Sequence, residues 1–320
     1  MLQHLIILLD DTATSFCHYN IPINKGKRPI DVDVLKEGIK YGMMENLMIH
    51  FVYPKDNLPL EYAEIINSID HIDIKPYIEG KKNEADVVVF NDLITHIQEN
   101  DSYNTAVIRL KKTDFFTFPS YLVRDMFKNV QKFNFIITDM ESSGESEFNQ
   151  YREKLHYLSE LIEEEYINGR SPQCNLVTDR MLLKEMNNCG AGDTSITLAP
   201  NGRFYICPAF YYEDMDDFVG DLKTGVNIIN KQLYKLEYAP ICSHCDAYQC
   251  RRCVWLNRKM TLEVNTPSHE QCVTAHIERN ASRILMQKIR QHGEFLPDKE
   301  IKEINYLDPF ENKEQWQQEN

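Results

Sequence analysis

Closely spaced cysteines in the second half of this chain restrict how that half can fold. The 320 residues contain nine cysteines, and four of them fall in the stretch CSHCDAYQCRRC (242–253). Each of its two C-x2-C pairs places two thiolates on one side of a tight loop, where a metal centre can bridge them. Thiolate-rich sets suit zinc or iron–sulfur clusters. We therefore expect the second half to fold around metal.

Three further cysteines accompany this stretch and complete the predicted ligand set. The predicted metal ligands are Cys189, Cys207, Cys242, Cys245, Cys250, Cys253 and Cys272. This set exceeds the four ligands of one tetrahedral zinc and suits two centres. Cys17 and Cys174 each stand alone, and we expect them to be buried free thiols, because unpaired cysteine packs like a small hydrophobic residue.

Up to about residue 188, short apolar runs alternate with longer helical patterns. The strand candidates are 5–9, 47–52, 71–74, 86–90, 105–110, 133–138 and 174–178, and the clearest helical patterns are 32–46 and 147–169. Strand and helix in alternation predict an α/β fold with a mostly parallel sheet covered by helices. We expect an open or partial (β/α) barrel, with a doubly wound open sheet as the competing topology.

Polar residues cluster where these predicted strands end, at Asp10, Asp11, Asn91, Asp92, Asp139 and Asp179. The carboxyl edge of such a sheet is where ligands bind, so these residues are a candidate pocket rim. The alternative is that each of them caps the helix that follows, since Asp and Asn are favoured at helix N-caps.

Charge and hydropathy exclude several classes of partner. The net charge of -14 disfavours nucleic acid, whose binding depends on clustered Lys and Arg. The apolar run 5–9 is too short for a signal peptide, and no run approaches the length of a membrane-spanning helix. We therefore predict a cytoplasmic protein without a membrane partner. In a reducing compartment the cysteines point to metal or catalysis rather than to disulfides.

Four sequence stretches together resemble a known family, the SPASM domain. They are CGAGDTSITLAPNGRFYICPAF (189–210), GDLKTG (220–225), CSHCDAYQCRRC and the last Cys272. The last two cysteine intervals of CSHCDAYQCRRC are each one residue shorter than in the family. The SPASM domain follows the barrel of many radical S-adenosylmethionine enzymes and carries auxiliary iron–sulfur clusters. The resemblance implies up to two 4Fe–4S clusters, with zinc as the alternative metal.

The resemblance also divides the ligands into two sets. The set nearer the barrel would be Cys189, Cys207 and Cys253. The distal set would be Cys242, Cys245, Cys250 and Cys272. The first set is one thiolate short of four, which implies an open iron position or a ligand from elsewhere. Arg251 and Arg252 would offset the negative charge of the clusters, or would be ordinary surface charges.

The first half resembles a radical S-adenosylmethionine barrel without its cofactor site. Such a barrel needs three cysteines in C-x3-C-x2-C after the first strand, and here TATSFCHYN offers only Cys17. A Gly-Gly-Glu-Pro element usually ends the second strand, and Tyr53-Pro54-Lys55 stands in its place. The whole chain is similar to CXXX-repeat peptide maturases, which implies a cysteine-rich ribosomal precursor peptide as substrate.

These observations predict three regions and one leading function. Residues 1–188 would form a degenerate radical S-adenosylmethionine-like barrel, and 189–295 a SPASM-like domain that ends in a helix at 273–293. Residues 296–320 would be an acidic tail that frays. The predicted function is maturation of a cysteine-repeat peptide. The alternatives are a non-catalytic carrier that presents the precursor peptide to a companion modification enzyme, and a structural zinc protein.

Overall fold

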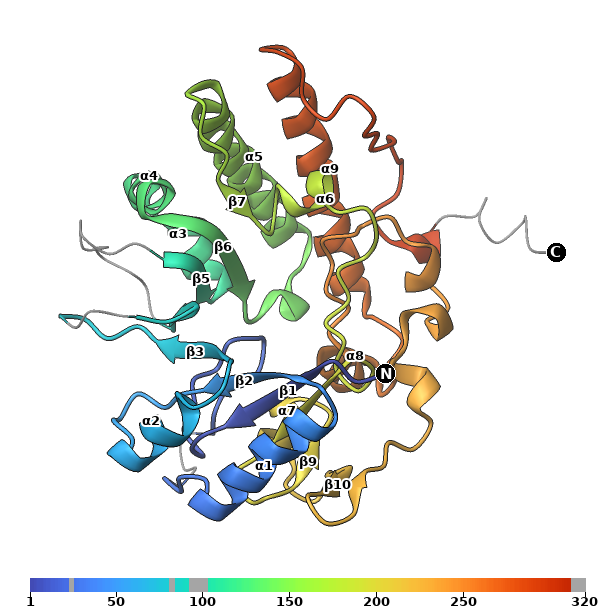
Figure 1. Ribbon diagram of the computed structural model, residues 1–320. Helices are drawn as coiled ribbons and strands as arrows, with labels where there is room; N and C mark the ends of the chain where they lie inside the picture. Colours follow the sequence, from blue (N-terminus) through green and yellow to red (C-terminus); the bar gives the residue numbers. More distant parts are fainter. Residues whose placement is uncertain (23–25, 81–83, 92–102, 312–320) are drawn as a thin grey trace. The chain divides into compact units, whose positions relative to one another are not determined.

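The protein is described by a computed structural model that covers residues 1–22, 26–80, 84–91 and 103–311. Within these residues the chain forms two compact units, each built from segments that are distant in sequence (Figure 1). Of the described residues, those up to 91 together with 103–109 and 190–238 form the first unit, and 110–189 and 239–311 form the second. No helix in the described part of the chain is long and apolar enough to cross a membrane.

A largely parallel sheet forms the centre of the first unit. Its strands, in the order in which they pair, are β5 (Tyr103–Leu110), β4 (Val87–Phe90), β3 (Ile72–Pro76), β2 (Met48–Val52), β1 (His4–Leu8), β8 (Ser195–Leu198) and β9 (Phe204–Tyr205). All of these pairs are parallel except that of β8 with β9. From β1 to β5 each strand lies beside its predecessor in the chain, as in a barrel, whereas a doubly wound sheet reverses its strand order.

Helices α1 (Val32–Met44) and α2 (Leu60–Ile66) complete the core of this unit. Their apolar side chains join the buried core cluster that contains Leu5, Ile7 and Phe51. Two glycines of α1 allow its close approach, since a Cβ at Gly38 would clash with the Leu198 side chain. The unit also contains α7 (Pro208–Glu213), the strand pair β10 (Gly220–Asp221) and β11 (Gly225–Val226), and two 3₁₀ turns, η2 (Lys231–Tyr234) and η3 (Leu236–Tyr238).

The second unit is mostly helical. Its helices are α3 (Lys112–Thr117), α4 (Ser120–Asn129), α5 (Glu145–Ile167), α6 (Asp179–Leu182), α8 (Val254–Thr261) and α9 (His269–Arg290). Its strands are β6 (Val130–Ile137) and β7 (Gln173–Cys174), which are parallel, and its 3₁₀ turns are η1 (Met140–Ser142), η4 (Cys242–His244) and η5 (Pro309–Glu311).

The two long helices of the second unit, α5 and α9, pack side by side (Figure 1). Buried residues recur every three or four positions along α5, which gives it one face for the core. A capping box between Ser268 and Gln271 fixes the start of α9. Between the helices, the hydroxyl of Tyr151 donates a hydrogen bond of 2.7 Å to Glu278.

The predicted α/β fold is confirmed, and two local expectations need correction. In 174–178 only Cys174 belongs to a strand, because the hydroxyl of Thr178 bonds to both the N–H and the C=O of Cys174 and turns the chain. The expectation of a fraying tail is wrong for 296–311, where Ile301 is buried and Lys302 accepts a hydrogen bond from Arg279. Residues 312–320 lie outside the described part.

Candidate metal centre

Four cysteines and one histidine line a single small cavity in the second unit. They are Cys242, Cys245, Cys250, Cys272 and His276, and we call this set the cysteine pocket. Its four thiols are the set predicted above as the distal ligands. Cys272 and His276 are distant in sequence from the other three residues, so their gathering around one cavity is a property of the fold.

Short turns and one helix bring these side chains together. Cys242 begins the turn η4, and the N–H of Cys245 bonds to the C=O of Cys242 at 3.2 Å. The N–H of Cys250 closes the next turn on the C=O of Ala247 at 2.9 Å. Cys272 and His276 are four residues apart on α9, so they lie on the same face of that helix.

Burial disfavours the thiolate form of the pocket cysteines. Removal from water raises the pKa of each of the four, and the pKa of Cys242 rises to about 12. Neighbouring thiols add to this rise, since Cys272 is influenced by Cys250, Cys242 and Cys245. A metal that binds here would displace protons and provide the positive charge that buried thiolates require.

One buried arginine lines the pocket and two more lie near Cys245, and their positive charge favours an anionic occupant. Arg252 lines the cavity and is only 2% exposed. Arg180 and Arg279, which are 3% and 0% exposed, share the carboxylate of Asp246, so this trio carries a net positive charge. Arg252 acts to lower the pKa of Cys242, and Arg279 and Arg180 act to lower that of Cys245, although burial outweighs them.

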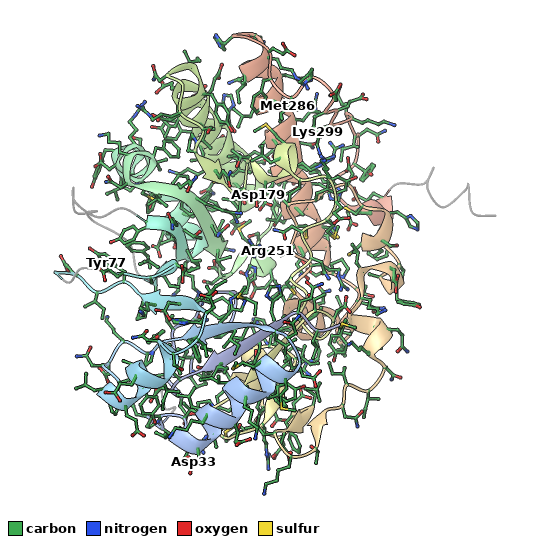
Figure 2. The ribbon with its side chains drawn as sticks, viewed as in Figure 1. Asp33, Tyr77, Asp179, Arg251, Met286 and Lys299 are labelled. Carbon is green, nitrogen blue, oxygen red and sulfur yellow. The ribbon has the colours of Figure 1, made fainter. Side chains whose placement is uncertain are left out.

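The two arginines between predicted ligands therefore differ. Arg251 is exposed and is labelled in Figure 2, whereas Arg252 is buried and its Nε donates to Asn188 at 3.0 Å. Of these two, only Arg252 is placed to offset charge in the pocket. The sequence did not indicate Arg180 or Arg279, because they reach Asp246 from 66 and 33 residues away.

The other predicted ligands lie in both units. In the second unit the N–H of Cys189 bonds to the C=O of Arg251 at 2.9 Å, and Cys253 is the N-cap residue of α8. Cys207 belongs to the first unit, where it precedes α7 and influences the pKa of Tyr19. Among the described residues, no group of three or more His, Cys, Asp or Glu side chains is arranged to hold one metal ion.

The two isolated cysteines differ in burial. Cys174 is fully buried, and burial raises its pKa to about 12, as expected of a thiol packed in the core. Cys17 is half-buried. Its loop follows β1, where a radical S-adenosylmethionine barrel would hold its cluster.

Side chains and backbone pack the loop after β1, residues 12–20, into the first unit. The buried guanidinium of Arg109 donates to the carbonyls of Cys17 and Tyr19, at 2.7 and 2.6 Å, and to the side chain of Asn20 at 2.9 Å. The ring of Tyr19 stacks on that of Tyr212 with centroids 5.4 Å apart. The loop is thus held in place by hydrogen bonds and aromatic packing.

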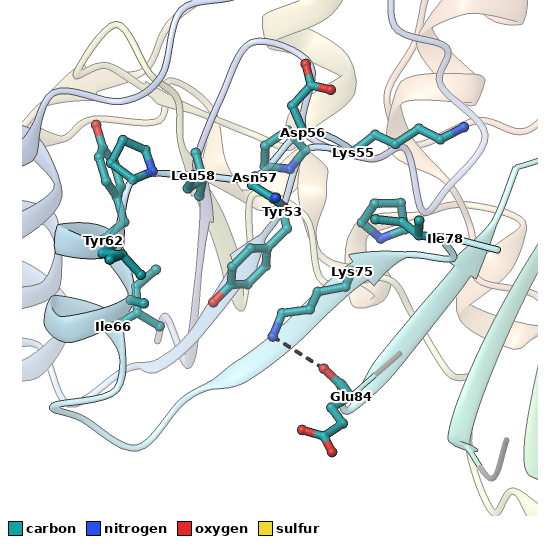
Figure 3. Close-up of a pocket in the computed structure, with 15 residues that line it drawn as sticks. Tyr53, Lys55, Asp56, Asn57, Leu58, Tyr62, Ile66, Lys75, Ile78 and Glu84 are labelled. Carbon is teal, nitrogen blue, oxygen red and sulfur yellow. Dashed lines mark hydrogen bonds between the residues drawn. The ribbon is translucent and has the colours of Figure 1, made fainter. Parts of the chain in front are cut away.

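A larger pocket of about 490 Å³ opens at the carboxyl ends of β2 and β3. Tyr53, Lys55 and Tyr62 line it, together with Lys75 and Glu84 (Figure 3). The Lys75 ammonium lies 4.5 Å from the centre of the Tyr53 ring and donates to the C=O of Glu84 at 3.4 Å. Tyr53 and Lys55 belong to the Tyr53-Pro54-Lys55 stretch singled out in the sequence.

Of the residues expected at a pocket rim, those that the structure describes do not line the pocket at β2 and β3. Asp10 accepts hydrogen bonds from Thr12, and Asp11 accepts one from Tyr211. Asn91 donates to Thr14 and accepts from Arg109. In the second unit the carboxylate of Asp139 accepts the N–H of Lys112 in the first turn of α3, and Asp179 is buried at the start of α6. Asp92 lies outside the described residues.

Comparisons with known proteins find a likeness of fold. No family model and no curated protein matches the sequence. The fold is similar to that of hexahistidine-tagged anSMEcpe with bound AdoMet, with a TM-score of 0.61 and 13% identity over 92% of this chain and 97% of that one. Native anSMEcpe with bound AdoMet and the Cp18Cys peptide gives 0.59 and 13% over 91% and 100%. The protein thus has an α/β fold of partial-barrel type, similar to a protein solved with AdoMet and a peptide.

Proposed function

We propose that this protein takes part in the maturation of a cysteine-containing peptide through an iron–sulfur domain of SPASM type. The observation that carries the proposal is the cysteine pocket, where four thiols gather around one cavity beside buried guanidinium groups. Such a set of donors suits a thiolate-ligated cluster, which is anionic. Zinc stays the alternative metal.

The chemistry of the pocket residues suits a four-iron cluster. Cys242, Cys245, Cys250 and Cys272 would each hold one iron, and thiolates on different irons need not converge on one point. Arg252 and the trio of Arg180, Arg279 and Asp246 would offset its charge. When bound, such a cluster supplies electron transfer or a Lewis-acidic iron.

The peptide partner is supported by the fold likeness and by the strand-end pocket. The neighbour anSMEcpe was solved with the Cp18Cys peptide. The pocket at β2 and β3 is large enough for one or two side chains and is lined by Tyr53 and Tyr62, which offer apolar rings with polar ends. We propose that a segment of the substrate peptide binds there.

The loop after β1 favours a second candidate function, a non-catalytic carrier. It contains a single cysteine, and Arg109, Tyr19 and Tyr212 occupy its surroundings. A loop packed in this way offers one thiolate where a radical cluster needs three. The carrier would present the precursor peptide to a companion enzyme that provides the chemistry.

Purification without oxygen tests which metal the protein binds. The protein should be brown, with absorbance near ~400 nm from thiolate-to-iron charge transfer, and should contain iron and sulfide. A colourless protein with stoichiometric zinc after reconstitution would replace the cluster with the structural zinc alternative.

The chemistry is tested by titrating the reconstituted protein with a cysteine-repeat peptide and with its Cys→Ser counterpart. We expect tighter binding of the cysteine peptide, a change in the cluster spectrum, and no 5′-deoxyadenosine from S-adenosylmethionine under strong reduction. Formation of deoxyadenosine would contradict the degenerate barrel. Equal binding of both peptides without a spectral change would favour the carrier.

A further inference from the structure

The cysteine pocket contains one more donor than a four-iron cluster requires from the protein. His276 lines the same cavity as the four thiols and is only 1% exposed. We propose that His276 is a metal ligand through Nε2 and shares one iron position with Cys245. This inference rests on the proposed iron–sulfur function and names a ligand outside the all-cysteine set.

A hydrogen bond within α9 determines which ring nitrogen of His276 carries the proton and which has the lone pair. Nδ1 lies 2.8 Å from the backbone carbonyl of Cys272, and a carbonyl only accepts, so Nδ1 carries the proton. In the neutral ring Nε2 then has a lone pair. Histidines that bind metals typically donate their other ring nitrogen to a carbonyl or carboxylate in this manner.

The separation of His276 from Cys245 suits two ligands of one metal atom. Nε2 lies 3.7 Å from the Cys245 sulfur. A metal–nitrogen and a metal–sulfur bond of about 2.0 and 2.3 Å add up to more than this distance, so one metal atom could reach both side chains. At this separation Nε2 can accept a hydrogen bond from the Cys245 thiol, and a bound metal atom would take the place of that proton.

The imidazole is held in this orientation from a third side. The ring of Tyr306 packs on it with centroids 5.6 Å apart, and this tyrosine comes from the segment that follows α9. Contacts with α9, with the Tyr306 ring and with the Cys245 thiol together hold the imidazole of His276 against the cavity. A ligand that is already oriented loses little conformational freedom when it binds metal.

The decisive measurement is nitrogen hyperfine coupling in pulsed electron paramagnetic resonance of the reduced protein. We expect a histidine nitrogen coupling that changes when histidine is labelled with ¹⁵N. In His276→Ala the coupling should disappear while Cys245 keeps the iron in place. His292→Ala, a partly exposed histidine beyond the end of α9, is the matched control and should retain the coupling.

Ligand sharing gives a second, independent result. Cys245→Ala should keep at least half of its iron because His276 takes over, whereas Cys250→Ala and the double variant Cys245→Ala/His276→Ala should lose most of it. Absence of nitrogen coupling in both the wild-type protein and Cys245→Ala would overturn the inference and leave the cluster proposal intact. A wild-type protein without iron would instead overturn the proposed function, and this inference with it.

Discussion

The cysteine pocket of the second unit and the loop after β1 in the first unit differ in how many thiols they bring together. In the pocket, four thiols and an imidazole surround one cavity, and buried guanidinium groups lie beside them. In the loop, a single half-buried thiol accompanies tyrosine rings and the hydrogen bonds of Arg109. The contrast teaches that thiols gather around a cavity in one place, whereas protein contacts fill the surroundings of the single thiol in the other.

The largest expected difference between the two places comes from replacing one cysteine in each of them by alanine. Cys242→Ala should lose metal and destabilise the second unit by about 5 kcal/mol, because metal binding and folding are coupled. Cys17→Ala should leave the metal content unchanged. Metal analysis and thermal unfolding of both variants check this, and loss of a cluster in Cys17→Ala would contradict it.

Arg109→Met tests whether the loop after β1 depends on protein contacts alone. The change removes the guanidinium that donates to the carbonyls of Cys17 and Tyr19, although Tyr19 still accepts from the hydroxyl of Ser15, so we expect a loss of about 3 kcal/mol in the free energy of unfolding. Metal content should stay the same. Urea unfolding with parallel metal analysis measures both, and a variant that loses metal would link the loop to a metal site.

Opposite pH dependences should distinguish the two units. Burial raises the pKa of Glu278 in the second unit to about 7, so its contribution to stability falls as pH rises from about 4.5 to 7. Burial lowers the pKa of His50 in the first unit to about 4, so its contribution is lost as pH falls from about 6.5 to 4. Glu278→Gln should therefore stabilise the protein by about 2 kcal/mol more at pH 8 than at pH 5.

Urea unfolding of Glu278→Gln and of His50→Gln at both pH values measures these slopes. His50→Gln should stabilise the protein more at pH 5 than at pH 8. Parallel profiles for wild type and either variant would show that the residue does not shift its pKa on folding.

The smallest expected effect, on metal affinity, comes from a matched pair of variants at two adjacent arginines. Arg252→Met removes a buried guanidinium from the cavity wall, and we expect metal affinity to fall about tenfold, as for other outer contacts of metal ligands. Arg251→Met changes an exposed neighbour and should have no effect. Competition with a chelator compares the two. Equal metal affinities of the two variants would show that the buried guanidinium of Arg252 does not stabilise the bound metal.

Sequence alone indicated the strands of the first unit and the thiols of the pocket, because both are local patterns. Runs such as 47–52 predict buried strands, and C-x2-C spacing predicts that Cys242 and Cys245 lie together. His276 had a weaker signal, its place four residues after Cys272 on a predicted helix. Arg109 and Arg180 had none, since their partners are defined by packing between distant segments.

The pairing of β1 with β8 has a consequence for how this chain acquires its structure. β1 lies between β2, which follows it closely, and β8, whose first residue Ser195 is opposite His4. One edge of β1 therefore stays exposed until a much later segment closes it, and such long-range pairing slows folding. An unpaired apolar strand edge invites association with other chains. A fragment that ends at residue 188 should thus aggregate during refolding, because it lacks the strand that closes this edge.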